Sequence, residues 1–178
     1  MPLHQTYTTQ RLFIKPTEKE DAAFILELFN TPKWKQFIGD RNLKTITEAE
    51  TYITQKMLPQ RERLGFSNYT VLRKSDGIKI GTCGLYDREG VQGIDLGFAL
   101  LPAYEKQGYA YEASKRVMEA AFYDFGYKTL SGITVKNNYA SQALLEKLGF
   151  IKTGTLTLPN DNTPLFLYQF TFSVEAES

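Results

Sequence analysis

Apolar and polar residues alternate over several short stretches of the chain, a pattern that is typical of half-buried strands. Between these stretches, apolar residues recur at helical spacing, most clearly at residues 22–29 and 110–121. The predicted strands cover residues 11–15, 66–74, 78–86, 93–101, 130–135, 150–158 and 165–172. The predicted helices cover residues 17–29, 47–58, 108–125 and 138–148.

Turn-forming residues indicate how these strands pair. Ser75-Asp76-Gly77 places an Asp-Gly pair between two β-rich stretches, which favours a hairpin. Residues 159–162, Pro-Asn-Asp-Asn, separate the last two strands in the same way. Antiparallel hairpins therefore flank a central strand-helix-strand-helix section. This order predicts an α/β protein with a mixed sheet rather than a doubly wound one.

Capping patterns predict where the first two helices begin. Thr17 with Glu20, and Thr47 with Glu50, have the Thr-x-x-Glu spacing of a capping box. The second helix is expected to stop before Pro59, because proline disfavours helical backbone in the residue that precedes it.

The length of 178 residues indicates one domain, which we expect to span residues 9–173 between loose termini at residues 1–8 and 174–178. The 21 basic and 20 acidic side chains give a net charge of +1, which lacks the cationic excess of a nucleic-acid-binding protein. No stretch approaches the roughly 18 apolar residues of a transmembrane helix. The first residues lack the pattern of a signal peptide. We therefore expect a cytoplasmic protein with neither nucleic-acid nor membrane partners.

The chain has one cysteine, Cys83, and one histidine, His4. A lone cysteine cannot form an internal disulfide, and this pair cannot supply the ligand set of a structural zinc site, so no metal is expected. Catalysis by Ser-His-Asp or Cys-His would depend on His4, close to the N-terminus. An enzyme with this sequence would therefore use an acid and a base other than imidazole. Cys83 is expected to be a small buried hydrophobic residue.

The junction between the strand at residues 93–101 and the next helix is a candidate phosphate site. Gly108 and Ala110 stand two residues apart there, and small side chains allow a ligand to approach the backbone. The first N–H groups of a helix have no internal acceptors and lie at the positive end of its dipole, which favours phosphate or pyrophosphate. The alternative is that Gly108 only permits a turn. The chain contains neither a P-loop motif nor a Gly-x-Gly-x-x-Gly motif.

The strand at residues 93–101 has two different faces. The apolar face consists of Ile94, Leu96, Phe98 and Leu100, and the other face consists of Asp95, Gly97 and Ala99. This second face has room either for an extended ligand that ends at Asp95 or for a closely packed helix.

A further segment begins the helix at residues 138–148. Asn138 or the preceding asparagine is a candidate N-cap, and Ser141 lies in the first turn. Through this segment and two others, the chain resembles the GNAT superfamily of acetyl-CoA-dependent N-acetyltransferases, and more closely the RimJ/RimL branch of ribosomal-protein N-terminal acetyltransferases. The segments that resemble it are Thr-Gln-Arg-Leu-Phe-Ile-Lys at residues 9–15, Gly-Tyr-Ala-Tyr-Glu-Ala at 108–113, and Asn-x-x-Ser-x-x-Leu-Leu-Glu-Lys-Leu-Gly-Phe at 138–150. The order of elements agrees over residues 9–173.

The resemblance implies a mostly antiparallel sheet with a splayed parallel strand pair, about four helices, and acetyl-CoA as acyl donor. The strand at residues 130–135 would splay from its neighbour and open a slot for the thioester. The backbone groups implied to pair with the pantetheine arm are those of Phe98, Ala99 and Leu100. The amides implied to hold the pyrophosphate are those of Gln107, Gly108, Tyr109, Ala110 and Tyr111. Asn138 would bond the pantetheine arm, and Ser141 would lie near the thiol.

The sequence departs from the pattern of the family at two positions. Glu105 stands where the pyrophosphate loop usually begins with Gln or Arg, and its charge is unfavourable unless the side chain points outward. Leu145 stands where many members carry a general-acid tyrosine, although RimJ/RimL-like members often lack it too.

The reaction implied is direct acetyl transfer to an amine, which must lose a proton to react. We assign Ser141 as the acid or thiolate stabiliser and Asp95 as the base acting through water, with Asp87 and Glu89 as rivals for the base. A strand amide near Phe98 or Ala99 is a candidate donor to the thioester oxygen.

The acceptor site is expected between the first two helices. Trp34 and Phe37 are candidates to line it, with Asp40 attracting the ammonium, although a place in the core is the favoured interpretation of both aromatic residues. The leading hypothesis is an N-acetyltransferase acting on a protein N-terminal α-amine or a small-molecule amine. The alternative is a non-catalytic acyl-CoA binding or sensing module. Neither the acceptor nor the oligomeric state follows from the sequence.

Overall fold

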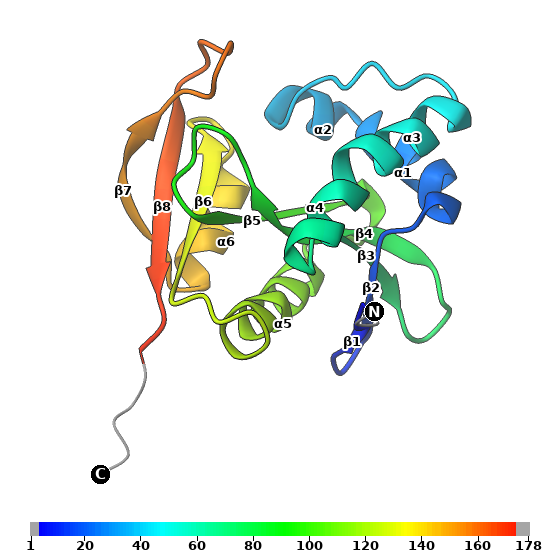
Figure 1. Ribbon diagram of the computed structural model, residues 1–178, viewed down its shortest axis with the longest axis horizontal. Coiled ribbons are helices and arrows are strands. Elements are labelled where there is room, and N and C mark those ends of the chain that lie inside the picture. Colours follow the sequence, from blue (N-terminus) through cyan, green and yellow to red (C-terminus); the bar gives the residue numbers. More distant parts are fainter. Residues whose placement is uncertain (1–3, 174–178) are drawn as a thin grey trace.

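A computed structural model describes residues 4–173, and the strands in this range form one eight-stranded sheet (Figure 1). The spatial order is β1-β2-β3-β4-β5-β6-β8-β7. The strands are β1 (Tyr7–Thr8), β2 (Leu12–Pro16), β3 (Asn68–Arg73), β4 (Lys79–Asp87), β5 (Ile94–Leu100), β6 (Thr129–Val135), β7 (Ile151–Leu156) and β8 (Leu165–Thr171). Both expected hairpins, β3–β4 and β7–β8, are present. The mixed sheet predicted from the order of elements is confirmed.

Helices cover both sides of the sheet. They are η1 (Lys19–Asp21), α1 (Ala22–Phe29), α2 (Pro32–Phe37), α3 (Ile46–Tyr52), η2 (Ile53–Met57), α4 (Leu58–Leu64), η3 (Pro102–Tyr104), α5 (Tyr109–Tyr123) and α6 (Tyr139–Lys147). Helix α5 packs against β2, β4 and β5, and α6 packs against β6. The helices α1 to α4 lie on the other side of the sheet from α5 (Figure 1). No helix within residues 4–173 is both long and apolar enough to cross a membrane.

The sheet is split between β5 and β6. These are the only parallel neighbours in the described part of the chain, and their register contains a single pair, Asp95 opposite Ser131. Beyond Asp95 the two strands diverge, so the carboxyl-terminal half of β5 has a partner strand on one side only (Figure 1). The splayed parallel pair implied by the resemblance is therefore present, and it leaves an opening in the middle of the sheet.

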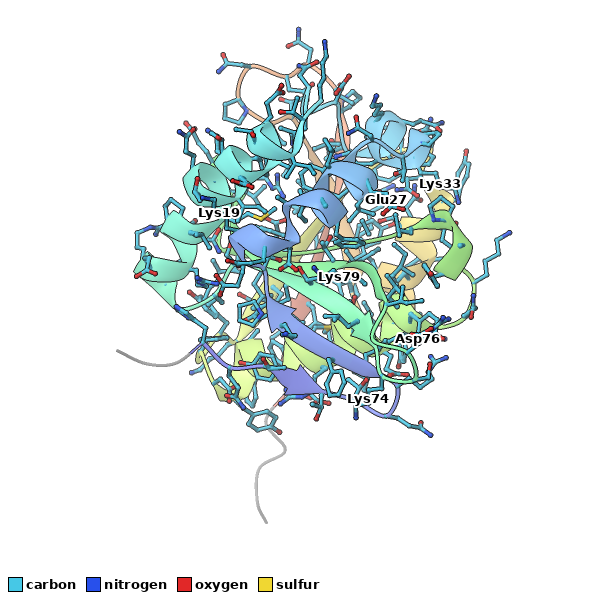
Figure 2. All side chains as sticks on the ribbon, turned by 90° about the vertical axis from the view of Figure 1, so that its right-hand side faces the viewer. Lys19, Glu27, Lys33, Lys74, Asp76 and Lys79 are labelled. Atoms are coloured by element: carbon cyan, nitrogen blue, oxygen red, sulfur yellow. The ribbon has the colours of Figure 1, made fainter. Side chains whose placement is uncertain are left out.

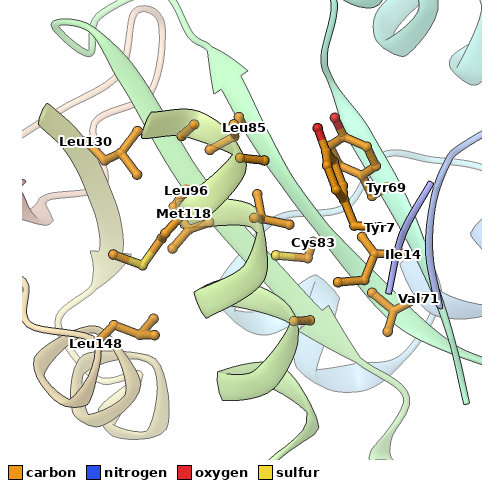
Figure 3. Close-up of a cluster of buried hydrophobic side chains, with 14 of the residues drawn as sticks. Tyr7, Ile14, Tyr69, Val71, Cys83, Leu85, Leu96, Met118, Leu130 and Leu148 are labelled. Atoms are coloured by element: carbon orange, nitrogen blue, oxygen red, sulfur yellow. The ribbon is translucent and has the colours of Figure 1, made fainter. Parts of the chain in front are cut away.

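The main core lies between the sheet and α5. Figure 3 shows Met118 of α5 facing side chains such as Leu96 and Leu130, with Cys83 and Val71 further along the sheet. Cys83 is only 1% exposed, and burial raises the pKa of its thiol to about 12, so it is protonated at neutral pH. The expectation that Cys83 is a small buried residue is confirmed.

The expectation of a loose N-terminus is wrong at Tyr7, although residues 1–3 and 174–178 lie outside the described residues. Tyr7 is only 2% exposed, and its hydroxyl donates to Asp124 Oδ2 at 2.9 Å. Its ring packs against Tyr69 (Figure 3). The guanidinium of Arg116 lies over the same ring, 4.5 Å from its centroid. The short strand β1 is held in place because it buries this aromatic side chain.

The segment at residues 46–64 differs from its predicted boundaries at both ends. The N-cap is Thr45, whose hydroxyl accepts from Glu48 N at 3.1 Å, instead of Thr47 two residues later. The helix also continues past Pro59 to the end of α4. Because Pro59 has no N–H to donate, the backbone widens into the π-helical turn η2 just before it, and the proline lies in the first turn of α4.

The first helix also begins differently from its prediction. Glu18 and Asp21 form the capping box of η1, and Thr17 instead bonds Thr70 through its buried hydroxyl. The helix α1 does end at Phe29, as predicted. The separate helix α2 was not foreseen, and it begins at Pro32 because Thr31 caps it by accepting from Trp34 N.

Candidate active site

The split in the sheet exposes the backbone of β5. The N–H of Leu101 donates to Ile80 O at 2.9 Å. Hydrogen-bonded pairs alternate along an antiparallel ladder, so every second residue of β5, counted back from Leu101, also bonds to β4. Ala99 belongs to that set, and a Cβ at Gly81 of β4 would collide with its carbonyl oxygen. The backbone groups of Phe98 and Leu100 therefore point into the opening. Of the three residues expected to pair with an extended ligand, these two have the required orientation, and Ala99 does not.

The amino-terminal end of α5 lies at the carboxyl side of β5. Gly108 is the N-cap residue and has a left-handed backbone with φ 82°, and Lys106 in the same loop has φ 61°. The backbone N–H groups of Tyr109, Ala110 and Tyr111 have no acceptor within residues 4–173. Free amides at the positive end of a 15-residue helix suit a phosphate or pyrophosphate group.

A side chain from the opening strand segment holds this loop. The guanidinium of Arg11 donates to Gln107 O at 2.9 Å and to Glu112 Oε1 at 2.8 Å, and it lies 4.3 Å from the ring centroid of Tyr109. Burial alone would raise the pKa of Glu112, but hydrogen bonds from Thr9 and Arg11 lower it below its usual range. Arg11 therefore fixes the loop that leads into the free amides.

Replacing Arg11 tests this arrangement. We expect Arg11→Gln to weaken acetyl-CoA binding about tenfold and to lower the free energy of unfolding by about 1 kcal/mol, because the loop loses two charge-assisted hydrogen bonds that are partly exposed. Lys128→Gln removes one positive charge outside the loop and serves as the control. Isothermal titration calorimetry measures the affinity, and urea unfolding measures the stability. An unchanged affinity in Arg11→Gln would show that the loop keeps its conformation without this side chain.

The carboxylate of Glu105 has a partner outside the loop. It forms an ion pair with Lys33 of α2, a side chain labelled in Figure 2. The charge that departs from the family pattern is thus compensated by a cation from a distant helix. This pair also ties α2 to the loop that follows β5.

The start of α6 positions the serine singled out in the sequence. Asn138 is the N-cap, and its Oδ1 accepts from Ser141 N at 3.2 Å. The hydroxyl of Ser141 has no partner within the described residues and lines the central cavity. Leu145, one turn further along, is 1% exposed and packs over Gly132 of β6, where a Cβ would lie 2.8 Å from Leu145 Cδ2. It therefore fills the space beside β6 with methyl groups and provides no acid.

A cavity of about 570 Å³ connects the split in the sheet to the helices α1 to α4. It brings together six of the predicted site residues, namely Trp34, Phe37, Asp95, Phe98, Asn138 and Ser141. Asp40 does not line it: its carboxylate accepts from Asn42 N at 2.8 Å and the residue is exposed. Gly39 and Arg41 line the cavity at that position instead.

Gly97 of β5 and Gly84 of β4 make room for the side chain of Tyr86, which the sequence did not reveal. The ring of Tyr86 lies over the strands, and a Cβ at Gly97 would be 2.7 Å from its Cε2 atom. A Cβ at Gly84 would be 2.6 Å from its hydroxyl oxygen. This hydroxyl donates to Asn68 Oδ1, and burial raises its pKa. The two glycines thus accommodate an aromatic side chain of β4, which forms a floor of the cavity.

Asp95 lies at the point where β5 and β6 part. It is only 1% exposed, yet it lines the cavity, and Tyr86 is its cross-strand neighbour. Burial raises the pKa of its carboxyl group, against the attraction of Arg88, whose Nε lies 3.4 Å from Asp95 Oδ1. The two rivals differ: Asp87 is exposed and paired with Arg63 at 2.8 Å, and Glu89 is exposed in the following loop.

The aromatic side chains of the helical wall form a stacked group. Trp34 lies 3.8 Å from Phe29 between ring centroids, and Phe29 meets Tyr52 edge to face at 5.3 Å. Trp34 and Tyr52 are half-buried and line the cavity, so they belong both to the core under α1 and to the cavity wall.

An exposed strand edge, free helix amides beside it and a cavity lined by a buried carboxylate are the features expected of an acyl-CoA-dependent acyltransferase. The profile of the family described as "Acetyltransferase (GNAT) domain" matches residues 11–151. The chain belongs to this family, and the resemblance seen in the sequence is confirmed.

Two relatives have names that agree with this assignment. The uncharacterized N-acetyltransferase YoaA of Bacillus subtilis (strain 168) is 26% identical over 149 residues, which cover 83% of this chain and 84% of the relative. The probable N-acetyltransferase YjcK of the same organism is 29% identical over 151 residues, covering 80% and 82%. The chain is therefore similar to N-acetyltransferases over most of its length, and it is an acetyl-CoA-dependent acyltransferase.

Solved structures share the fold across nearly the whole chain. An acetyltransferase from Agrobacterium tumefaciens str. C58 has a TM-score of 0.80 at 21% identity, covering 94% of this chain and 95% of its own. RimL, a ribosomal α-N-protein acetyltransferase in complex with coenzyme A, has a TM-score of 0.80 at 14% identity, covering 94% and 98%. Apo FdhC, a nucleotide-linked sugar GNAT, has a TM-score of 0.75 at 22% identity, covering 95% and 91%.

Proposed function

We propose that this protein transfers the acetyl group of acetyl-CoA directly to a primary amine, either a protein N-terminal α-amine or the amine of a small molecule. The observation that carries the proposal is the single cavity that joins the open edge of β5 to Asp95 and Ser141. Similar folds occur in RimL and in FdhC, whose names refer to a protein and to a nucleotide-linked sugar. The acceptor is thus proposed at the level of a primary amine.

The donor is proposed to lie along the split in the sheet. Phe98 and Leu100 offer backbone groups to the pantetheine arm, which would bind like an added strand. The amides at the start of α5 would hold the pyrophosphate. Asn138 uses Oδ1 for its cap, which leaves its Nδ2 to donate to the arm. These residues fit acetyl-CoA because each has a hydrogen-bonding group without a partner within the described residues.

The thioester supplies an activated acetyl group with a thiol leaving group of moderate pKa. In the proposed mechanism, Asp95 removes the proton of the incoming amine through water, and its raised pKa makes it a stronger base than an exposed carboxylate. The backbone N–H of Phe98 donates to the thioester oxygen. The hydroxyl of Ser141 donates to the departing sulfur. Placement of the two substrates supplies much of the remaining rate.

Turnover measurements test this proposal. We expect acetyl-CoA at 100 times its dissociation constant to stabilise the protein by about 2.7 kcal/mol, and ATP and NAD to have no such effect. Release of free coenzyme A is then measured with a panel of primary amines and N-terminal peptides. Ser141→Ala should lower kcat about tenfold to hundredfold with an unchanged KM for acetyl-CoA, because the hydroxyl acts on the leaving group. Stabilisation without turnover of any amine would indicate a binding module instead.

A further inference from the structure

The charged side chains of the cavity are unevenly distributed. The four cations and three carboxylates that line it are Lys35, Arg41, Lys56, Arg88, Asp87, Asp95 and Asp161. All three carboxylates already have partners: Asp87 pairs with Arg63, and Asp95 pairs with Arg88. Asp161, in the loop between β7 and β8, accepts from Thr163 N at 2.9 Å, and this hydrogen bond lowers the pKa of its carboxyl group.

The remaining cations lie on one wall. Lys35, Arg41 and Lys56 come from α2, the loop after it and η2, and none of them forms an ion pair within residues 4–173. Arg41 and Lys56, together with Tyr52, also line a smaller adjoining cavity of about 340 Å³. Arg41, Lys56 and Tyr52 therefore lie where the two cavities meet.

The backbone beside Arg41 makes room for its guanidinium. Gly39 has φ 129°, a conformation that side chains rarely adopt, and a Cβ there would lie 3.0 Å from Arg41 Nη1. Arg41 therefore folds back over a position without a side chain and is half-buried at the cavity wall. A half-buried guanidinium is ordinarily paired, because its desolvation is offset by a carboxylate or phosphate.

We propose that the acceptor amine carries a carboxylate or phosphate group, which Arg41 and Lys56 bind at this wall. A guanidinium fork matches the oxygens of either group bidentately, and Lys56 adds a second charge. The amine end of the same molecule then lies at Asp95 and the edge of β5, which line the same cavity. This inference rests on the proposed function and specifies the acceptor class of its site.

Matched pairs of amines test the inference. The first two pairs are O-phosphoethanolamine with ethanolamine, and 4-aminobutanoate with butylamine. The third pair is the peptide amides Ser-Asp-Glu and Ser-Asn-Gln, which separates a peptide source of the anion from a small-molecule source. Binding to the protein saturated with coenzyme A is measured by calorimetry, and acetylation is measured by release of coenzyme A. The variants are Arg41→Gln and Lys56→Gln, and the control is Lys44→Gln, an exposed cation that lines neither cavity.

We expect the anionic member of at least one pair to bind about tenfold more tightly than its neutral partner. Arg41→Gln should abolish this preference, Lys56→Gln should reduce it, and Lys44→Gln should leave it unchanged. The affinity for acetyl-CoA should be the same in all variants. Equal binding of both members in every pair, or a preference that survives in Arg41→Gln, overturns the inference. Preferential binding without acetylation would support the anion site and refute the proposed function.

Discussion

Gly108→Val should weaken acetyl-CoA binding by at least about hundredfold. The backbone of Gly108 is left-handed, with φ 82°, and β-branched side chains are strained in that conformation. A Cβ would also lie 3.3 Å from Arg11 Nη2, the side chain that holds the loop. The first amides of α5 must therefore move. Each hydrogen bond from such an amide to a charged group contributes about 1.5–3 kcal/mol, so the loss of two accounts for the expected change.

The other end of the same helix provides a matched control. Gly126 follows α5, has φ 76°, and a Cβ there meets nothing within 4 Å. Gly126→Val therefore introduces similar backbone strain, about 1–3 kcal/mol, without touching the proposed pyrophosphate site. We expect both variants to be destabilised by similar amounts in urea, and only Gly108→Val to lose affinity in calorimetry. Comparable affinities in the two variants would refute the assignment of this loop.

Local motifs were predictable because their geometry is decided within a few residues. Gly108 at the start of α5 and Asn138 at the start of α6 lie where the sequence placed them, since a left-handed cap and an Asx cap each depend on adjacent backbone. The exact N-cap of α3 was not predictable, because Thr45 and Thr47 both have an acidic residue three positions later. The structure selects Thr45, whose partner Glu48 also accepts from Lys44 N.

Long-range contacts decided the features that the sequence did not reveal. Arg11 and Glu112 are 101 residues apart, and no local pattern indicates that the first strand segment holds the loop before α5. The same holds for Glu105, whose unfavourable charge is compensated by Lys33 from a different helix. Gly97 suggested close packing by a ligand or a helix, and the neighbouring Tyr86 ring occupies that space instead.

Asp95→Asn should lower kcat about a hundredfold or more while leaving the fold as stable as the wild type, or more stable. The lower kcat is expected because a general base contributes about 10²–10⁴ to the rate. The stability follows from burial, which raises the pKa of Asp95 in the folded protein. A raised carboxyl pKa contributes stability that is fully present below the unfolded pKa and lost as the pH rises through the folded pKa. At pH 8 the wild type therefore contains a costly buried charge, which asparagine removes.

The pH dependence separates this role from a structural one. Because the base acts when ionised, kcat/KM of the wild type should fall as the pH is lowered through the raised pKa of Asp95, and this limb should be absent in Asp95→Asn. Asp87→Asn and Glu89→Gln are the controls, since both side chains are exposed, and both variants should retain the limb. If Asp95→Asn instead loses stability at pH 8 together with activity, the carboxylate serves mainly to pair with Arg88. If the limb disappears in Asp87→Asn or Glu89→Gln, the base is one of those residues.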